Sequence, residues 1–233
     1  MKRLDKFRSS YQLLVASISS IISVLVVDYL SVYLPSKTIS TAIMLIIIVS
    51  AITIATVVME RLIDNSSWLR KAILREQFIE GFWGDVSAEK KDGHIAQGAL
   101  LHIYYEDGDI KVSGISFDIQ GNKIAAFNSV NTTLLDRTLY YLYNTQSIYA
   151  PSFSETGVGQ LAFDYPPISY TGFFVDFASG TMFRVEGEKV IKDRLHKFND
   201  FSSVKDKAEF VIEFLKTKNE AVSQHNATVN NAG

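Results

Sequence analysis

Two long apolar stretches stand close together near the N-terminus of the chain, at residues 11–34 and 39–59. Each is longer than the about 20 residues that an α-helix needs to cross the hydrocarbon core of a bilayer. Only residues 35–38 separate them, which allows a reversal but leaves no room for a folded element. The pattern therefore predicts a two-helix transmembrane hairpin over residues 11–59, preceded by a basic segment at residues 1–10.

The segment at residues 60–80 carries apolar residues at three- and four-residue steps among charged ones. This spacing is typical of an amphipathic helix, so we predict a connector helix here. Two interpretations of its role remain. The basic residues Arg70, Lys71 and Arg75 lie against anionic lipid headgroups, or the helix packs on the domain that follows.

From residue 81 the pattern changes to an alternation of period two, with β-branched and aromatic residues between turn signals such as Glu106-Asp107-Gly108 and Ser179-Gly180. Eight short strands joined mainly by tight turns favour an up-and-down antiparallel β-barrel, because closure removes the exposed sheet edges. A barrel of this size can hold one small ligand. We predict strands at residues 82–88, 97–105, 109–118, 122–129, 132–143, 160–165, 171–178 and 181–190.

Two connections in this barrel are longer, at residues 144–159 and 164–171, and both are candidate lids at the barrel mouth. A capping box at Ser203 opens a helix that we expect to end near Asn219 and to pack on the barrel. The barrel domain with its C-terminal helix then covers residues 81–221. The polar tail at residues 222–233 is predicted to be disordered.

Basic residues gather beside the outer ends of the hairpin, whereas the turn between its helices holds only Lys37. Because Lys and Arg resist translocation, this asymmetry predicts that both termini are cytoplasmic. A cleaved signal peptide is the alternative interpretation of the first stretch, but that stretch is long and a second one follows at once.

Composition excludes several classes of function. The net charge of −2 provides no basic field for a DNA or RNA duplex, and the absence of cysteine rules out disulfides and thiolate metal sites. The chain has no HExxH, GxSxG or Walker pattern, and its histidines His94, His102, His196 and His225 show no paired spacing. We expect no enzymatic activity, no metal and no cofactor.

Cationic and aromatic residues supply the candidate binding chemistry. Arg137 and Arg184 are the only arginines on the predicted strands. An arginine that faces the lumen needs an anionic ligand or an acidic partner such as Asp85, Asp136 or Asp176 to offset its desolvation. Aromatic faces beside a guanidinium suit a nucleobase stacked near its phosphate. The candidate ligand-binding residues are Arg184, Arg137, Tyr104, Tyr141, Tyr143 and Trp83.

The apolar stretches also contain small and ionisable residues. Ser19 and Ser23 stand four apart, as do Ala51 and Ala55, which allows close contact between helices in lipid. They pack the hairpin on itself or mediate assembly of several hairpins. Asp28 is costly in hydrocarbon unless it hydrates or pairs, so it is a further candidate for assembly.

The order of these parts, with Gly81-Phe82-Trp83, Tyr-Tyr-Leu-Tyr at 140–143 and Gly-Phe-Phe-Val-Asp at 172–176, resembles the two-transmembrane, β-strand-rich effectors of bacterial cyclic-oligonucleotide-based anti-phage signalling systems. The resemblance implies a cytoplasmic β-barrel that binds a cyclic dinucleotide from a partner nucleotide synthase. It also implies that binding drives self-association of the helices and disruption of the inner membrane, which ends in cell death or growth arrest.

Two other functions fit the same sequence. The barrel is a membrane-tethered, lipocalin-like carrier or receptor for an apolar ligand, or it is a structural scaffold with a filled interior. The polarity of the lumen discriminates between a dianionic and an apolar ligand.

Overall fold

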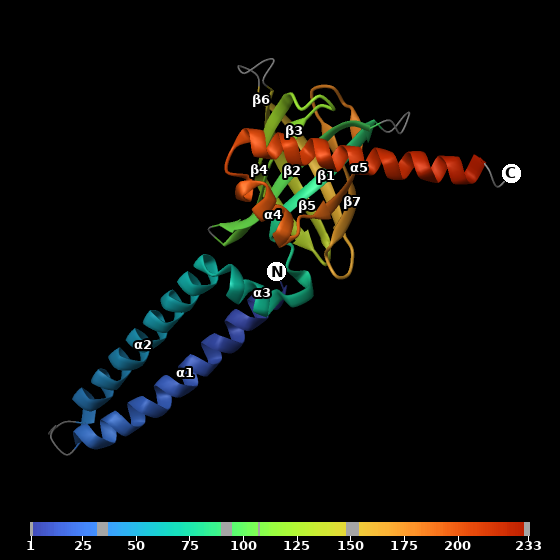
Figure 1. Ribbon diagram of the computed structural model, residues 1–233. Helices are drawn as coiled ribbons and strands as arrows, with labels where there is room; N and C mark the ends of the chain where they lie inside the picture. The colour runs from blue at the N-terminus through green and yellow to red at the C-terminus, as the bar shows by residue number, and fades with distance from the viewer. Residues whose placement is uncertain (1, 32–36, 90–94, 107, 148–153, 231–233) are drawn as a thin grey trace. The chain divides into compact units, whose positions relative to one another are not determined.

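The computed structural model describes residues 2–31, 37–89, 95–106, 108–147 and 154–230. The chain divides into two compact units, residues 1–75 and residues 76–233. The first is helical and the second contains all the strands (Figure 1).

The helical unit begins with two long helices, α1 (Lys2–Ser31) and α2 (Lys37–Asn65), which pack along one another. The hydroxyl of Tyr11 on α1 donates to the carbonyl of Ala55 on α2 at 3.4 Å. Each helix holds a 21-residue segment, Lys6–Val26 and Leu45–Asn65, that is long and apolar enough to cross a membrane. Only 11% and 6% of these segments are buried, which is unlike the core helices of a soluble protein. Their exposed apolar side chains form a surface of the kind that marks a membrane or protein interaction site.

The predicted connector helix over residues 60–80 is interrupted. α2 continues to Asn65, and a separate helix α3 (Ser67–Leu74) follows. Ser66 caps α3, because its hydroxyl accepts a hydrogen bond from the amide of Leu69 at 3.2 Å. The Arg70 guanidinium is buried and donates to the last carbonyls of α2, those of Ile63 and Asp64, both at 2.6 Å. Arg70 therefore serves as a cap rather than as a headgroup contact.

Eight strands form a closed barrel in which each strand pairs antiparallel with the next and β8 pairs with β1, as the sequence predicts. A 3-10 turn η1 (Arg75–Gln77) leads into the first strand. The strands are β1 (Gly81–Glu89), β2 (Ile95–Glu106), β3 (Asp109–Phe117), β4 (Lys123–Leu135), β5 (Thr138–Ser147), β6 (Ser154–Phe163), β7 (Ser169–Asp176) and β8 (Met182–Lys189).

Two predicted boundaries inside the barrel are wrong. β4 does not end near Ser129; its register shifts between Ser129 and Asn131, so the polar residues there form a bulge and not a turn. The real turn lies at Asp136, whose φ is 55°, and separates β4 from β5. The predicted loop at residues 144–159 is mostly strand, because β5 reaches Ser147 and β6 begins at Ser154; its residues 148–153 lie outside the described part of the chain.

The outer face of β1, β2 and β3 is covered by the C-terminal helix α5 (Val204–Asn230), which follows the short elements α4 (Lys192–Lys197) and η2 (Asn199–Phe201) (Figure 1). The capping box is present, with the amide of Asp206 donating to the Ser203 hydroxyl at 3.1 Å. Gly84 and Gly98 make room for the helix, since a Cβ on either would lie within 3.0 Å of Phe210 or Val211. α5 continues to Asn230, past the predicted end near Asn219 and through most of the tail expected to be disordered. Its buried residues are Phe210, Val211, Phe214 and Leu215.

Candidate functional site

One half of the barrel lumen is packed solid. This closed half lies at the end where the chain enters β1, and none of its main side chains is more than 4% exposed. The β6–β7 connection, with Pro166 and Pro167, is at this same end, so the expectation that it forms a lid at the barrel mouth is wrong. The side chains that fill the closed half are Trp83, Leu101, Ile103, Val112, Leu139, Leu161, Phe163 and Tyr170.

The segment that precedes β1 is attached to the closed half. The indole nitrogen of Trp83 donates to the carbonyl of Ile79 at 2.9 Å, and Ile79 itself is buried. The ammonium of Lys189 donates to the carbonyl of Phe78 at 3.3 Å and lies 5.2 Å from the ring centroids of both Phe78 and Trp83. The residues that continue toward the helical unit are therefore fixed to the barrel interior.

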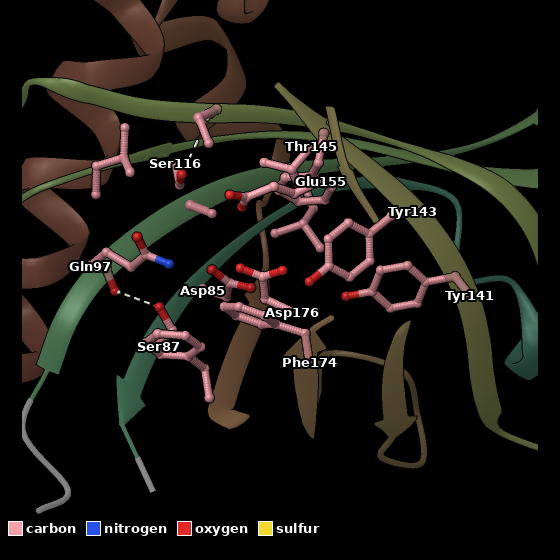
Figure 2. A pocket seen from close by; sticks show the side chains of 16 residues that line it. Asp85, Ser87, Gln97, Ser116, Tyr141, Tyr143, Thr145, Glu155, Phe174 and Asp176 are labelled. Atoms are coloured by element: carbon pink, nitrogen blue, oxygen red, sulfur yellow. Dashed lines mark hydrogen bonds between the residues drawn. The ribbon is translucent and has the colours of Figure 1, made fainter. Parts of the chain in front are cut away.

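The other half of the lumen is open. It holds a cavity of about 770 Å³, part of it open to solvent, to which all eight strands contribute side chains (Figure 2). The part of this volume that the centre of a water molecule can occupy is about 160 Å³, which is smaller than the about 300–1,000 Å³ typical of pockets for drug-sized ligands. Its lining residues are Asp85, Ser87, Gln97, Ala99, Leu101, Ser116, Ile124, Ala125, Phe127, Tyr141, Tyr143, Thr145, Glu155, Phe174, Asp176 and Phe183.

An aromatic wall forms one side of the cavity. Tyr141 and Tyr143 point inward from β5, and their ring centroids are 5.7 Å apart (Figure 2). Each ring lies across a glycine on β6, Gly159 for Tyr141 and Gly157 for Tyr143, which are their partners in register. A Cβ on Gly159 would lie 2.2 Å from the Tyr141 ring. The glycines thus allow the rings to lie flat on the neighbouring strand and hold them against the barrel wall.

A buried carboxyl group, that of Asp85, lies between the cavity and the closed half. Its Oδ2 accepts a hydrogen bond from the Tyr170 hydroxyl at 2.9 Å, and the Ala99 amide also donates to the carboxyl. Burial raises the pKa of Asp85 from 3.8 to about 7, although these two hydrogen bonds oppose the shift. Tyr170 packs on Trp83, with ring centroids 5.4 Å apart, so Asp85 joins the cavity to the closed half.

Two further carboxyl groups, those of Glu155 and Asp176, lie together in the lining. The negative charge of Asp176 raises the pKa of Glu155, and burial and a hydrogen bond between the two carboxyls add to the shift. The backbone amide of Ala178 donates to Asp176 at 3.0 Å and helps to fix its position in the β7–β8 turn. Among the described residues the lining contains no lysine or arginine, so the cavity is acidic.

The structure brings two of the predicted ligand-binding residues into the cavity, Tyr141 and Tyr143. Trp83 faces the lumen but is fully buried in the closed half, where its ring packs on Phe163 and Tyr170. It cannot touch a ligand in the cavity without rearrangement of that packing.

The other three predicted residues lie outside the lumen. Arg184 is exposed on the outer face of β8, and Arg137 is exposed in the β4–β5 turn at the closed end. Tyr104 stacks on His102 on the outer face of β2, with ring centroids 4.9 Å apart. The expectation that Arg184 meets a ligand phosphate inside the barrel is therefore wrong, because its neighbours Phe183 and Val185 take the inward positions of the strand.

Sequence reasoning missed the acidic residues as cavity groups, although it named Asp85 and Asp176 as partners for a lumen arginine. A signal was present in β8, where Arg184, Glu186 and Glu188 alternate with apolar residues and so mark the solvent face. On β1 the same alternation places Asp85 on the same side of the strand as Trp83, which is the side that faces the lumen.

The small residues of the hairpin are divided between two environments. Ser19 and Ser23 are buried within the single helical unit, and the Ser23 hydroxyl donates to the carbonyl of Ser19 at 2.6 Å. They therefore pack the hairpin on itself. Ala51 is half-buried and Asp28 is exposed on α1.

The fold and the cavity define a small β-barrel with one open lumen pocket, joined to two helices that are long and apolar enough to cross a membrane. Among the described residues, no three His, Asp or Glu side chains are grouped to hold a metal ion.

No protein-family model and no curated protein matches this chain. Among solved structures, a redesigned β-barrel, mFAP1, bound to DFHBI is similar, with a TM-score of 0.38 and 17% sequence identity over 49% of this chain and 97% of that chain.

Proposed function

We propose that this protein is a ligand-gated membrane effector of anti-phage defence. Its barrel binds a cyclic dinucleotide in the open half of the lumen, and binding promotes self-association of the two apolar helices, which then disrupt the bacterial inner membrane. The observation that carries this proposal is the division of the lumen, with a cavity in one half and a packed half that holds the segment leading to the helices.

The lining favours a ligand with planar rings and N–H groups. Tyr141, Tyr143 and Phe174 offer faces for stacking, and the carboxyls offer hydrogen-bond acceptors. The same carboxyls repel phosphates, so a cyclic dinucleotide inserts a base and keeps its phosphates toward solvent.

The two competing functions fit the cavity less well. A carrier of apolar molecules needs a dry aliphatic lining, whereas this one contains Asp85, Glu155 and Asp176. A scaffold with a filled barrel has no use for an open half.

A continuous set of contacts joins the cavity to the segment that leads to the helices, and it supports the proposed coupling. Asp85 accepts a hydrogen bond from Tyr170, Tyr170 packs on Trp83, and Trp83 donates to the carbonyl of Ile79. Four residues before Ile79 in the chain is Arg75, the last residue of the helical unit. A ligand that displaces the Asp85 carboxyl changes the position of groups that hold this linker, and closely packed groups transmit such displacements.

In this proposal both termini and the barrel lie in the cytoplasm, and the basic residues at the outer ends of the hairpin support that orientation. Self-association then uses the outward faces of the helices, with exposed residues such as Leu13, Ile21 and Val49, because Ser19 and Ser23 are occupied within one hairpin.

The test uses the full-length protein in lipid nanodiscs and in dye-loaded vesicles. Cyclic di-GMP, cyclic di-AMP and cyclic di-UMP are titrated, and oligomer size and dye release are measured. A ligand can shift assembly only if it binds the assembled state more tightly, so the expected result is binding together with larger oligomers and dye release. Binding without a change in oligomer size would favour the carrier, and absence of binding by all three would refute the ligand assignment.

A further inference from the structure

The carboxyl of Asp85 is a buried acidic group of the cavity lining, at the boundary with the closed half. Asp85 is only 5% exposed, yet its side chain points into the cavity among the aromatic rings (Figure 2). The Tyr170 hydroxyl and the Ala99 amide donate to it from the wall side. An ionised carboxylate has about four lone-pair positions, so acceptor capacity remains for a group that enters from the cavity.

Every other charged group in the described lining is also acidic, namely Glu155 and Asp176. The hydroxyls of Tyr141 and Tyr143 point toward the side of the cavity that carries the carboxyls (Figure 2). The described lining thus has no cationic donor for a phosphate and instead presents acceptors beside flat aromatic faces. This arrangement recognises a planar group with N–H donors on its edge.

We propose that Asp85 is the specificity-determining residue of the lumen, and that its carboxylate accepts two adjacent N–H groups of a guanine base that inserts along the Tyr141 and Tyr143 wall. The inference rests on the proposed function and deepens it. Guanine places its ring N–H beside its exocyclic amino group, so both can donate to one carboxylate. Adenine places an acceptor beside its amino group and loses one of the two hydrogen bonds.

Ionisation of Asp85 is needed for this recognition. Burial raises the pKa of Asp85 to about 7 in the empty barrel, and the donors of guanine favour the charged form. The pH of the binding experiment is therefore set to 8, where the carboxylate predominates.

The experiment compares the full-length protein in detergent micelles with two variants by calorimetric titration. Asp85→Asn removes the charge and replaces one acceptor oxygen with an NH2 donor, but keeps an oxygen for Tyr170. Glu186→Gln is the matched control, because Glu186 is an exposed carboxyl on the outer face of β8. The probes are cyclic di-GMP and cyclic di-AMP, with guanosine and inosine as probes that carry no phosphate; inosine lacks the exocyclic amino group.

We expect cyclic di-GMP to bind more tightly than cyclic di-AMP, and guanosine more tightly than inosine. Asp85→Asn should weaken cyclic di-GMP by about tenfold or more, as loss of a hydrogen bond to a charged group does, and should leave cyclic di-AMP within about threefold. Glu186→Gln should change neither.

The outcomes separate this inference from the proposed function. Equal binding of cyclic di-GMP by the parent and Asp85→Asn, or a preference of the parent for cyclic di-AMP, would overturn the role of Asp85 and leave the effector proposal standing. Asp85-dependent binding of guanosine without binding of any of the three cyclic dinucleotides, cyclic di-UMP included, would support the role of Asp85 and refute the effector's ligand. If none of the four probes binds, the role of Asp85 is wrong, and if cyclic di-UMP does not bind either, the effector proposal is wrong as well.

Discussion

The buried carboxyl of Asp85 should make the stability of the barrel depend on pH, and Asp85→Asn should remove that dependence. The pKa of Asp85 is about 7 in the folded protein, against 3.8 as the ordinary value. Between these values the folded state binds more protons than the unfolded state, so stability falls as the pH rises. At about 1.36 kcal/mol per pKa unit, the folded protein loses about 4 kcal/mol from this group between pH 4 and pH 8.

Asparagine is uncharged at all these pH values and keeps an oxygen that accepts the Tyr170 hydroxyl. We therefore expect Asp85→Asn to be more stable than the parent by about 2–4 kcal/mol at pH 8, and to differ by less than about 1 kcal/mol near pH 4. The measurement is urea unfolding in detergent, followed by the fluorescence of Trp83. Trp68→Phe is introduced into both proteins, since Trp68 is the only other tryptophan of the chain.

The difference between the two unfolding curves at each pH is the decisive quantity, because other titrating groups are shared. Glu186→Gln serves as the control for loss of an exposed carboxylate and should give a constant difference near zero. Parallel pH dependences for the parent and Asp85→Asn would refute the reasoning, since they would mean that Asp85 is solvated as well in the folded barrel as in the unfolded chain.

Three further predictions address the wall, the linker and the topology. Gly159→Ala should destabilise the barrel by about 1–3 kcal/mol in urea unfolding, because its Cβ overlaps the Tyr141 ring, and should be nearly neutral in a Tyr141→Ala background. Trp83→Phe removes the donor to the carbonyl of Ile79, so it should keep ligand affinity within about threefold but abolish the ligand-induced increase in oligomer size measured in nanodiscs. Lys205→Cys supplies the only thiol of the chain at an exposed position, and a membrane-impermeant reagent should label it in lysed cells but not in intact ones.

The architecture of the barrel could be predicted from sequence because its signals are local. Period-two alternation and turn residues mark the eight strands, and closure follows from the cost of free sheet edges. The misplaced boundary near Ser129 shows the limit of local signals. A mostly polar run, Asn128 to Thr133, looks like a turn, yet the strand continues through it as a bulge because β5 supplies the pairing partners.

The site was harder to predict because it depends on which face of each strand is inward. On β1, β2 and β3 both faces are buried, one in the lumen and one under α5, so burial does not reveal the inward face. Tyr104 and Tyr105 are adjacent and chemically alike, but only Tyr105 is inward and buried. Tyr141 and Tyr143, which were chosen as aromatic rings that can stack on a base, share a face because they stand two apart on one strand, but that spacing does not say that the face is inward.

The same carboxyl that lowers the stability of the empty barrel is the one best placed to bind a ligand. Asp85 is buried with no cation of the described residues beside it, and its ionisation at pH 8 opposes folding. A ligand that donates two N–H groups favours the ionised form, so part of its binding free energy comes from removing that penalty. Because Tyr170 contacts both Asp85 and Trp83, the change occurs at the contact that leads to the linker. A well-hydrated carboxylate at the barrel mouth would carry no desolvation penalty in the ligand-free protein, so a ligand could gain no binding free energy by removing it. The burial of Asp85 therefore matters for a ligand-gated mechanism.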